Sequence, residues 1–98
     1  GAAVNSLSSS LANNIIIADG QGNRRINVDA SGRVGIGTNT PSTTAILDIT
    51  STTGGVLFPR MTTTQRDAIS SPPDGLVVYN STTNKLQVRA ASAWVDLH

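Results

Sequence analysis

Apolar residues at the start of the chain recur at the spacing of a helix. Val4, Leu7 and Leu11 are separated by three and four residues, which is the pattern of a coiled-coil seam. The run is short, because an isolated helix needs ~12–15 residues to be stable in water. Residues 4–11 are therefore either the end of a coiled coil or an extended lead-in.

After residue 14 the apolar period changes to two. Short apolar stretches alternate with Gly-bearing turns about every ten to twelve residues, which is typical of architectures built from short strands. These stretches predict four strands: Ile15–Ile17, Ile26–Val28, Val34–Ile36 and Ala45–Ile49. The pattern predicts a β-rich stem segment over residues 1–50.

One of the predicted strands lacks side chains on one face. Gly35 and Gly37 alternate with Val34 and Ile36. A missing side chain allows another backbone to approach closely. We therefore expect these four residues to lie at a packing contact, either around a three-fold axis or at the corner of an intertwined β-prism.

Residues 51–98 predict a compact module of a different kind. Val56–Phe58 is a short apolar strand that ends at Pro59, which has no backbone N–H. The module boundary is expected in the Ser-, Thr- and Gly-rich stretch just before this strand, at residues 51–55.

The rest of this module has the pattern of a helix followed by a meander. Thr62 and Gln65 have the spacing of a capping box and predict a helix over residues 63–70, which the prolines that follow terminate. Alternating apolar positions then predict a three-stranded β-meander over residues 76–97. The predicted fold class is all-β with one short helix.

Composition favours an obligate oligomer. Charged residues make up 13% of the 98 residues, against about 25% in an ordinary soluble domain. The only aromatic residues are Phe58, Tyr79 and Trp94, so one chain has little with which to build its own core. We expect copies of the chain to complete that core, with Trp94 at the core or the subunit interface.

Charge and residue content exclude several functional classes. A net charge of +1 gives no basic footprint for nucleic acid, and no apolar run reaches the ~20 residues that a membrane-spanning helix needs. There is no cysteine, and His98 is the only histidine. The loop Asp19–Asn23 lacks the spacing of a calcium loop. We expect no nucleic-acid partner, membrane insertion, catalytic residue, metal or cofactor.

Three charged residues are candidates for structural ion pairs. Arg60 follows Pro59, and Arg66 and Asp67 are neighbours on the predicted helix. A guanidinium can bind a carboxylate through two parallel hydrogen bonds. We expect these residues to link elements within a chain or between chains.

Two long blocks resemble modules of known fibre proteins. GRVGIGTNTP, followed by LDI, occupies residues 32–49, and a PRMTxxQRDAI…GLxxYN…W module occupies residues 55–97. Both blocks resemble trimeric β modules of phage and virus tail or head fibres. The resemblance implies a homotrimeric, fibrous, all-β protein of the virion, located in an extracellular fibre involved in host attachment and able to contact other virion proteins.

The resemblance leaves two functions open. The leading interpretation is a structural, trimer-forming segment of the fibre. The alternative is a receptor-binding tip, in which Asn80, Asn84 and Ser92 recognise a host surface glycan or protein. Related modules often carry aromatic residues and a glycine before the Trp, whereas this chain has Val88–Ala93 there.

Overall fold

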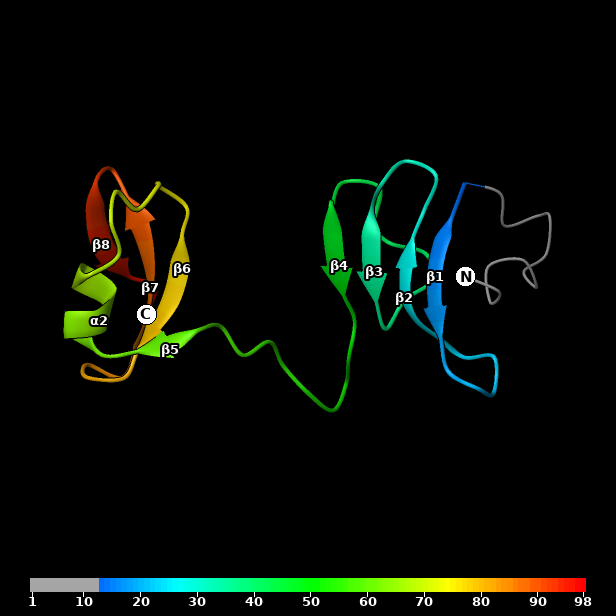
Figure 1. Cartoon of the computed structure of the whole chain (residues 1–98), viewed down its shortest axis with the longest axis horizontal. Coiled ribbons are helices and arrows are strands. Elements are labelled where there is room, and N and C mark those ends of the chain that lie inside the picture. The colour runs from blue at the N-terminus through cyan, green and yellow to red at the C-terminus, as the bar shows by residue number, and fades with distance from the viewer. Residues whose placement is uncertain (1–12) are drawn as a thin grey trace. The chain divides into compact units, whose positions relative to one another are not determined.

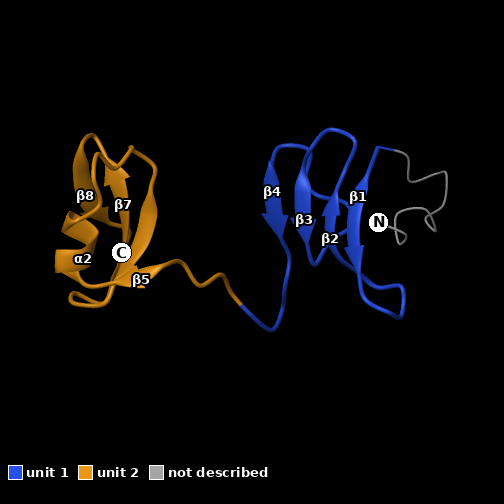
Figure 2. Ribbon diagram, viewed as in Figure 1, with its two compact units in different colours: residues 1–54 blue, residues 55–98 orange. Residues whose placement is uncertain are grey.

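The computed structural model describes residues 13–98, which form two four-stranded sheets and one short helix (Figure 1). The chain divides into two compact units, residues 1–54 (unit 1) and residues 55–98 (unit 2), shown in Figure 2. The predicted all-β fold with one short helix is confirmed. The coiled-coil pattern of residues 4–11 lies outside the described residues.

Unit 1 is a sheet whose strands follow their order in the sequence. The first three strands are antiparallel neighbours, and the fourth runs parallel to the third. Its strands are β1 (Ile15–Ala18), β2 (Arg24–Val28), β3 (Val34–Ile36) and β4 (Leu47–Ile49). Strand β4 begins two residues later than predicted, although the Ile46 carbonyl already accepts a hydrogen bond from the Val34 N–H of β3.

The parallel pairing of β3 and β4 requires a crossover, and residues 37–46 supply it. This crossover lies against one face of the sheet. A Cβ atom on Gly35 would overlap the Thr38 carbonyl oxygen and stand 3.1 Å from Pro41 Cγ. The Ser42 N–H also donates to Asp48 Oδ2 at 2.8 Å. The Gly35 face of unit 1 is therefore covered by the unit's own chain.

Unit 2 is a second sheet with one parallel edge strand. Its strands, in spatial order, are β5 (Arg60–Met61), β6 (Val77–Asn80), β7 (Lys85–Ala90) and β8 (Ala93–Asp96). Strand β5 runs parallel to β6, and the other pairs are antiparallel.

The prediction of a strand at Val56–Phe58 is wrong. Pairing with β6 begins only at Pro59, whose carbonyl accepts from the Tyr79 N–H at 2.9 Å. The preceding residues leave the sheet as an extended segment (Figure 2).

Helix α2 (Thr63–Asp67) begins as predicted and ends early. Thr62 Oγ1 accepts from the Gln65 N–H, and Gln65 Oε1 accepts from the Thr62 N–H at 2.9 Å, which completes the predicted capping box. The helix is shorter than the predicted 63–70. The Ile69 N–H donates to the Arg66 carbonyl three residues back, which is the tighter pattern of a helix end, and the positive φ of Ser71 and the proline after it prevent any continuation.

Candidate functional site

The register of unit 1 places its large aliphatic residues on one face. Side chains alternate between faces along a strand, and paired residues on neighbouring strands share a face. Two rows of four residues cross the sheet on this face: Ile15–Val28–Val34–Leu47 and Ile17–Ile26–Ile36–Ile49. We call these eight residues the aliphatic face.

No described residue of unit 1 covers the aliphatic face, because the crossover occupies the opposite side. The exposed fractions of Ile15, Ile17, Ile36, Leu47 and Ile49 range from 38% to 64%. A contiguous apolar surface of this kind on a small domain is typical of an interaction site.

The covered face of unit 1 is more polar than the aliphatic face. Asn27 pairs with Ile16 on one side and with Gly35 on the other, and Gly35 pairs with Asp48, so these four residues share the covered face. Asn27 is only 1% exposed. Unit 1 is thus inverted relative to an ordinary amphipathic sheet, which buries its apolar side and exposes its polar side.

Unit 2 shows the same inversion only in part, because the face that its helix covers carries the buried Val78 and the half-buried Trp94 beside its polar residues. Helix α2 lies on the face that carries Asn80 and Gln87, to which Thr63 and Arg66 are hydrogen-bonded. The opposite face carries apolar residues and has no helix over it. We call it the outer face of unit 2, and it consists of Val77, Tyr79, Leu86, Val88 and Val95.

A buried hydrogen-bond network connects α2 to the sheet. Asn80 is 0% exposed, and its Nδ2 donates to Thr63 Oγ1 at 2.9 Å and to Gln87 Oε1 at 3.1 Å. Arg66 Nη1 also donates to Gln87 Oε1, at 2.8 Å, and Gln87 Nε2 donates to Asp96 Oδ1 at 2.7 Å. Because these groups are paired with one another, the polar face of unit 2 can be buried at little cost.

Three predicted residues meet beside this network. Arg66 Nε and Nη2 both donate to Asp67 Oδ1, at 3.1 Å and 2.8 Å. The Arg66 guanidinium also lies over the Trp94 ring, 5.4 Å from its centroid, and that of Arg89 lies 5.7 Å from it. Trp94 therefore contacts two cations, each contact being worth about 0.5–1 kcal/mol at a partly exposed site. Arg60 forms no ion pair with the described residues, so its pairing between chains stays a prediction.

The predicted receptor residues do not form one site. Asn80 is not in an exposed loop but in β6, with its side chain fully buried under α2. Asn84 lies in the β6–β7 turn and Ser92 in the β7–β8 turn, so the two are at opposite ends of β7. Strand β7 spans about 20 Å at its six residues.

Both predicted glycines lie at close backbone approaches, and the approaching backbone belongs to the same chain. Gly35 faces the crossover, as described above. Gly37 has a φ of +78°, and a Cβ there would overlap the Thr50 carbonyl oxygen. Their neighbours Val34 and Ile36 point to the aliphatic face.

The turns of unit 1 are held by carboxylates. Asp19 accepts from the side chain of Asn23, from the backbone N–H groups of Asn23 and Gln21, and from Arg25 Nη2 at 2.7 Å. These hydrogen bonds, led by that of the Asn23 side chain, hold the pKa of Asp19 well below its ordinary value. Asp29 is arranged similarly, and the hydrogen bond from the Arg33 N–H is the largest cause of its lowered pKa.

Two other kinds of site are absent from residues 13–98. No three His, Cys, Asp or Glu side chains gather there as metal ligands. That part of the chain also has no helix of the length and apolar character needed to cross a membrane.

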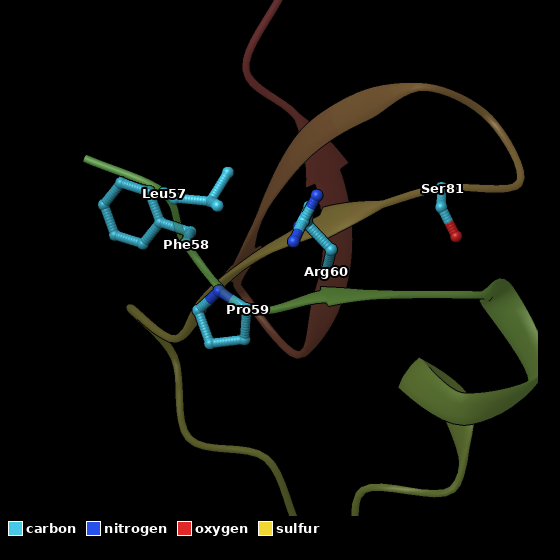
Figure 3. A pocket seen from close by; sticks show the side chains of 5 residues that line it. All are labelled: Leu57, Phe58, Pro59, Arg60 and Ser81. Carbon is cyan, nitrogen blue, oxygen red and sulfur yellow. The ribbon is translucent and has the colours of Figure 1, made fainter. Parts of the chain in front are cut away.

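The segment before β5 carries exposed apolar side chains. Val56, Leu57 and Phe58, which we call the apolar arm, are 39% to 72% exposed. Leu57 and Phe58 line an open hollow with Pro59, Arg60 and Ser81 (Figure 3).

Sequence reasoning missed the inverted faces and the buried network. Gln87 lies between Leu86 and Val88, and Asn80 follows the four apolar residues 76–79. One signal in the sequence could have indicated this buried amide pair. An amide directly follows an apolar run, and a second amide lies between two apolar residues of the next strand.

Comparison with known proteins gives one match. The family model described as a phage tail-like trimerisation region matches residues 35–98, from the middle of β3 to the end of the chain. No curated protein and no solved structure matches the chain.

Proposed function

The chain belongs to the family of phage tail-like trimerisation regions, and from that premise we propose that it is a structural segment holding three copies of a phage fibre in register. The aliphatic face of unit 1 is the observation that carries this proposal. Three such faces turned toward a common axis bury one another and form the core of an intertwined β-prism. Each fully buried Val, Leu or Ile contributes about 1.5–3 kcal/mol.

The core of a single chain is too small to account for the fold. Val78 is the only buried hydrophobic residue among residues 13–98. A domain normally buries its apolar residues against one another and leaves polar residues outside. In our proposal residues 1–50 form the trimeric stem and residues 51–98 form a compact module attached to it.

We place this segment in the extracellular fibre of a virion, where it supports host attachment and adjoins other virion proteins. Family membership supports the virion component, and the inverted sheets support a mechanical role. The alternative of a glycan-binding tip has less support, because Asn80 is buried and Asn84 and Ser92 lie at opposite ends of the sheet.

A charge at the centre of the aliphatic face tests the proposal. Ile36 pairs with both Ile26 and Ile49, so Ile36→Asp would place three carboxylates in the proposed core. We expect the parent to be a trimer by sedimentation equilibrium and light scattering, and the variant to dissociate, because an unpaired buried charge is very costly.

Ile46→Asp is the matched control. Ile46 is a highly exposed residue next to β4 that does not belong to the aliphatic face. This variant should remain trimeric. A monomeric parent, or an Ile36→Asp protein as trimeric as the control, would contradict the proposal.

A further inference from the structure

The apolar arm has no backbone partner among the described residues, and its side chains are only partly covered in the single chain. Residues 55–58 form no backbone hydrogen bond with any described residue. Leu57 is 72% exposed, and Val56 and Phe58 are exposed as well. Three consecutive large apolar residues in an unpaired extended segment are typical of a segment that binds another surface.

The arm cannot readily fold back over its own sheet. Pro59 fixes its own φ and restricts Phe58 to extended conformations. Pro59 is also held at the sheet edge through its carbonyl, which accepts from the Tyr79 N–H. The arm leaves the sheet at that point instead of continuing along β6 (Figure 2). A surface on another copy is therefore easier to reach than the outer face beside it.

The outer face of unit 2 offers an apolar surface of suitable extent. Val88 lies at its centre, because it pairs with Val77 on one side and Val95 on the other. Tyr79 and Leu86 form the adjacent row. The network of Asn80 and Gln87 occupies the opposite face, so α2 does not compete for this surface.

We propose that the apolar arm of each copy lies across the outer face of unit 2 of a neighbouring copy, with Leu57 near Val88. This inference rests on the proposed trimer. The arm and the outer face both lie within the matched trimerisation region, residues 35–98. Each chain has one arm and one outer face, so three head-to-tail contacts close into a ring and leave neither surface exposed.

Disulfide trapping tests this contact, because the chain has no cysteine of its own. We would combine Leu57→Cys with Val88→Cys, oxidise the protein and separate it on a denaturing gel. Two cysteines form a bond only when their Cα atoms are within about 7 Å. The expected product is a covalent trimer that returns to monomers on reduction.

The other products would overturn the arm exchange. A disulfide within one chain leaves the monomer mass and would show that the arm covers its own sheet. A covalent dimer from Val88→Cys alone would show that outer faces meet one another. Absence of any disulfide would also overturn it. Light scattering on the parent shows which of the two proposals fails. If the parent is a trimer but the 57–88 disulfide does not form, the proposed trimer stands and the arm exchange is rejected.

A pair of serine variants gives a second test without cysteine. Leu57 and Ile46 are both 72% exposed in the single chain, but only Leu57 belongs to the arm. We expect Leu57→Ser to raise the protein concentration at which the trimer dissociates by about tenfold or more, which for a monomer–trimer equilibrium is about a hundredfold in the dissociation constant. Ile46→Ser should leave that concentration within about twofold. Equal effects of the two variants would reject the exchange.

Discussion

Units 1 and 2 both turn aliphatic residues outward, but they cover their inner faces in different ways. Unit 1 uses its own crossover, which comes so close that Gly35 has no room for a side chain. Unit 2 uses helix α2, which is connected to the sheet through side-chain hydrogen bonds. Added volume should therefore damage unit 1, and removal of a polar group should damage unit 2.

The two buried asparagines extend this contrast. Asn27 in unit 1 accepts one hydrogen bond, from Arg24 Nη1 at 3.3 Å, and its Nδ2 has no partner among the described residues. Asn80 in unit 2 donates and accepts through both ends of its amide. A buried amide with paired atoms stabilises the fold, whereas an unpaired one costs free energy. Asn80 is thus the better paired of the two buried asparagines, although unit 2 has one buried side-chain atom without a partner of its own among residues 13–98, Arg89 Nε.

Gly37→Val should have the largest effect on stability, because it places a side chain where the backbone of unit 1 approaches Gly37 closely. A Cβ there would overlap the Thr50 carbonyl oxygen, and a β-branched residue is strained at a φ of +78°. We expect a loss of at least ~2 kcal/mol in the free energy of unfolding. Thermal unfolding should show the loss at every protein concentration, because Thr50 belongs to the same chain.

Gly20→Ala is the control for this prediction. No atom lies within 4 Å of a Cβ built at Gly20. Its stability should change by less than about 1 kcal/mol. A Gly37→Val protein that melts as high as the parent would show that unit 1 tolerates added volume, and the contrast between the units would lose its basis.

Asn80→Ala tests the polar side of the comparison. The substitution removes the partner of Thr63 Oγ1 and of the Thr82 N–H, and it leaves a small void under α2. We expect a loss of about 2–3 kcal/mol, since leaving a buried polar group unpaired costs about 1–3 kcal/mol. Chemical denaturation followed by circular dichroism measures it.

Asn84→Gly is the matched change at an exposed position. Asn84 has a φ of 59°, which glycine adopts without strain, so stability should change by under ~0.5 kcal/mol. If Asn80→Ala were as mild, the buried network would not be what holds the helix to the sheet.

Local patterns were sufficient to predict much of the fold. The period-two spacing of Ile26, Val28, Val34 and Ile36 predicted β2 and β3, because alternation is a property of each strand alone. The capping box at Thr62 was equally local. The missing strand at Val56–Phe58 shows the limit, since apolar residues form a strand only where a neighbouring strand can pair with them.

The candidate site was harder to predict, because it depends on register. The sequence indicated Val34 and Ile36 as packing residues, but only the pairing shows that they share a face with Ile15 and Leu47. Asn80 was predicted as a receptor-binding residue in the alternative function, which requires an exposed side chain, as amides usually have. Its burial depends on Gln87 and Thr63, which are distant in the sequence.

The β7–β8 turn gives a smaller, stabilising prediction for unit 2. Ala91 and Ser92 both have positive φ, a combination that two-residue hairpin turns normally fill with Asn-Gly. We expect Ala91→Asn combined with Ser92→Gly to stabilise the protein by about 1–2 kcal/mol. Hydrogen exchange should slow in β7 and β8 but not in unit 1. Equal slowing in both sheets would mean that the two units unfold together.

The smallest effect is expected from acid, and it should be confined to unit 1. The pKa of Asp19 and that of Asp29 are both lowered in the folded chain, so the unfolded chain binds protons more readily than the folded one. The stability from these turns is therefore fully present above the pKa of an unfolded Asp, ~4, and falls as the pH drops through the lower folded values. Asp19→Asn cannot be protonated at this position, so its melting temperature should fall less than that of the parent between about pH 5 and pH 2.

Hydrogen exchange in β1 and β2 should show the same difference, while exchange in β7 responds equally in both proteins. Identical acid profiles for parent and variant in β1 and β2 would mean that the Asp19 carboxylate does not hold this turn.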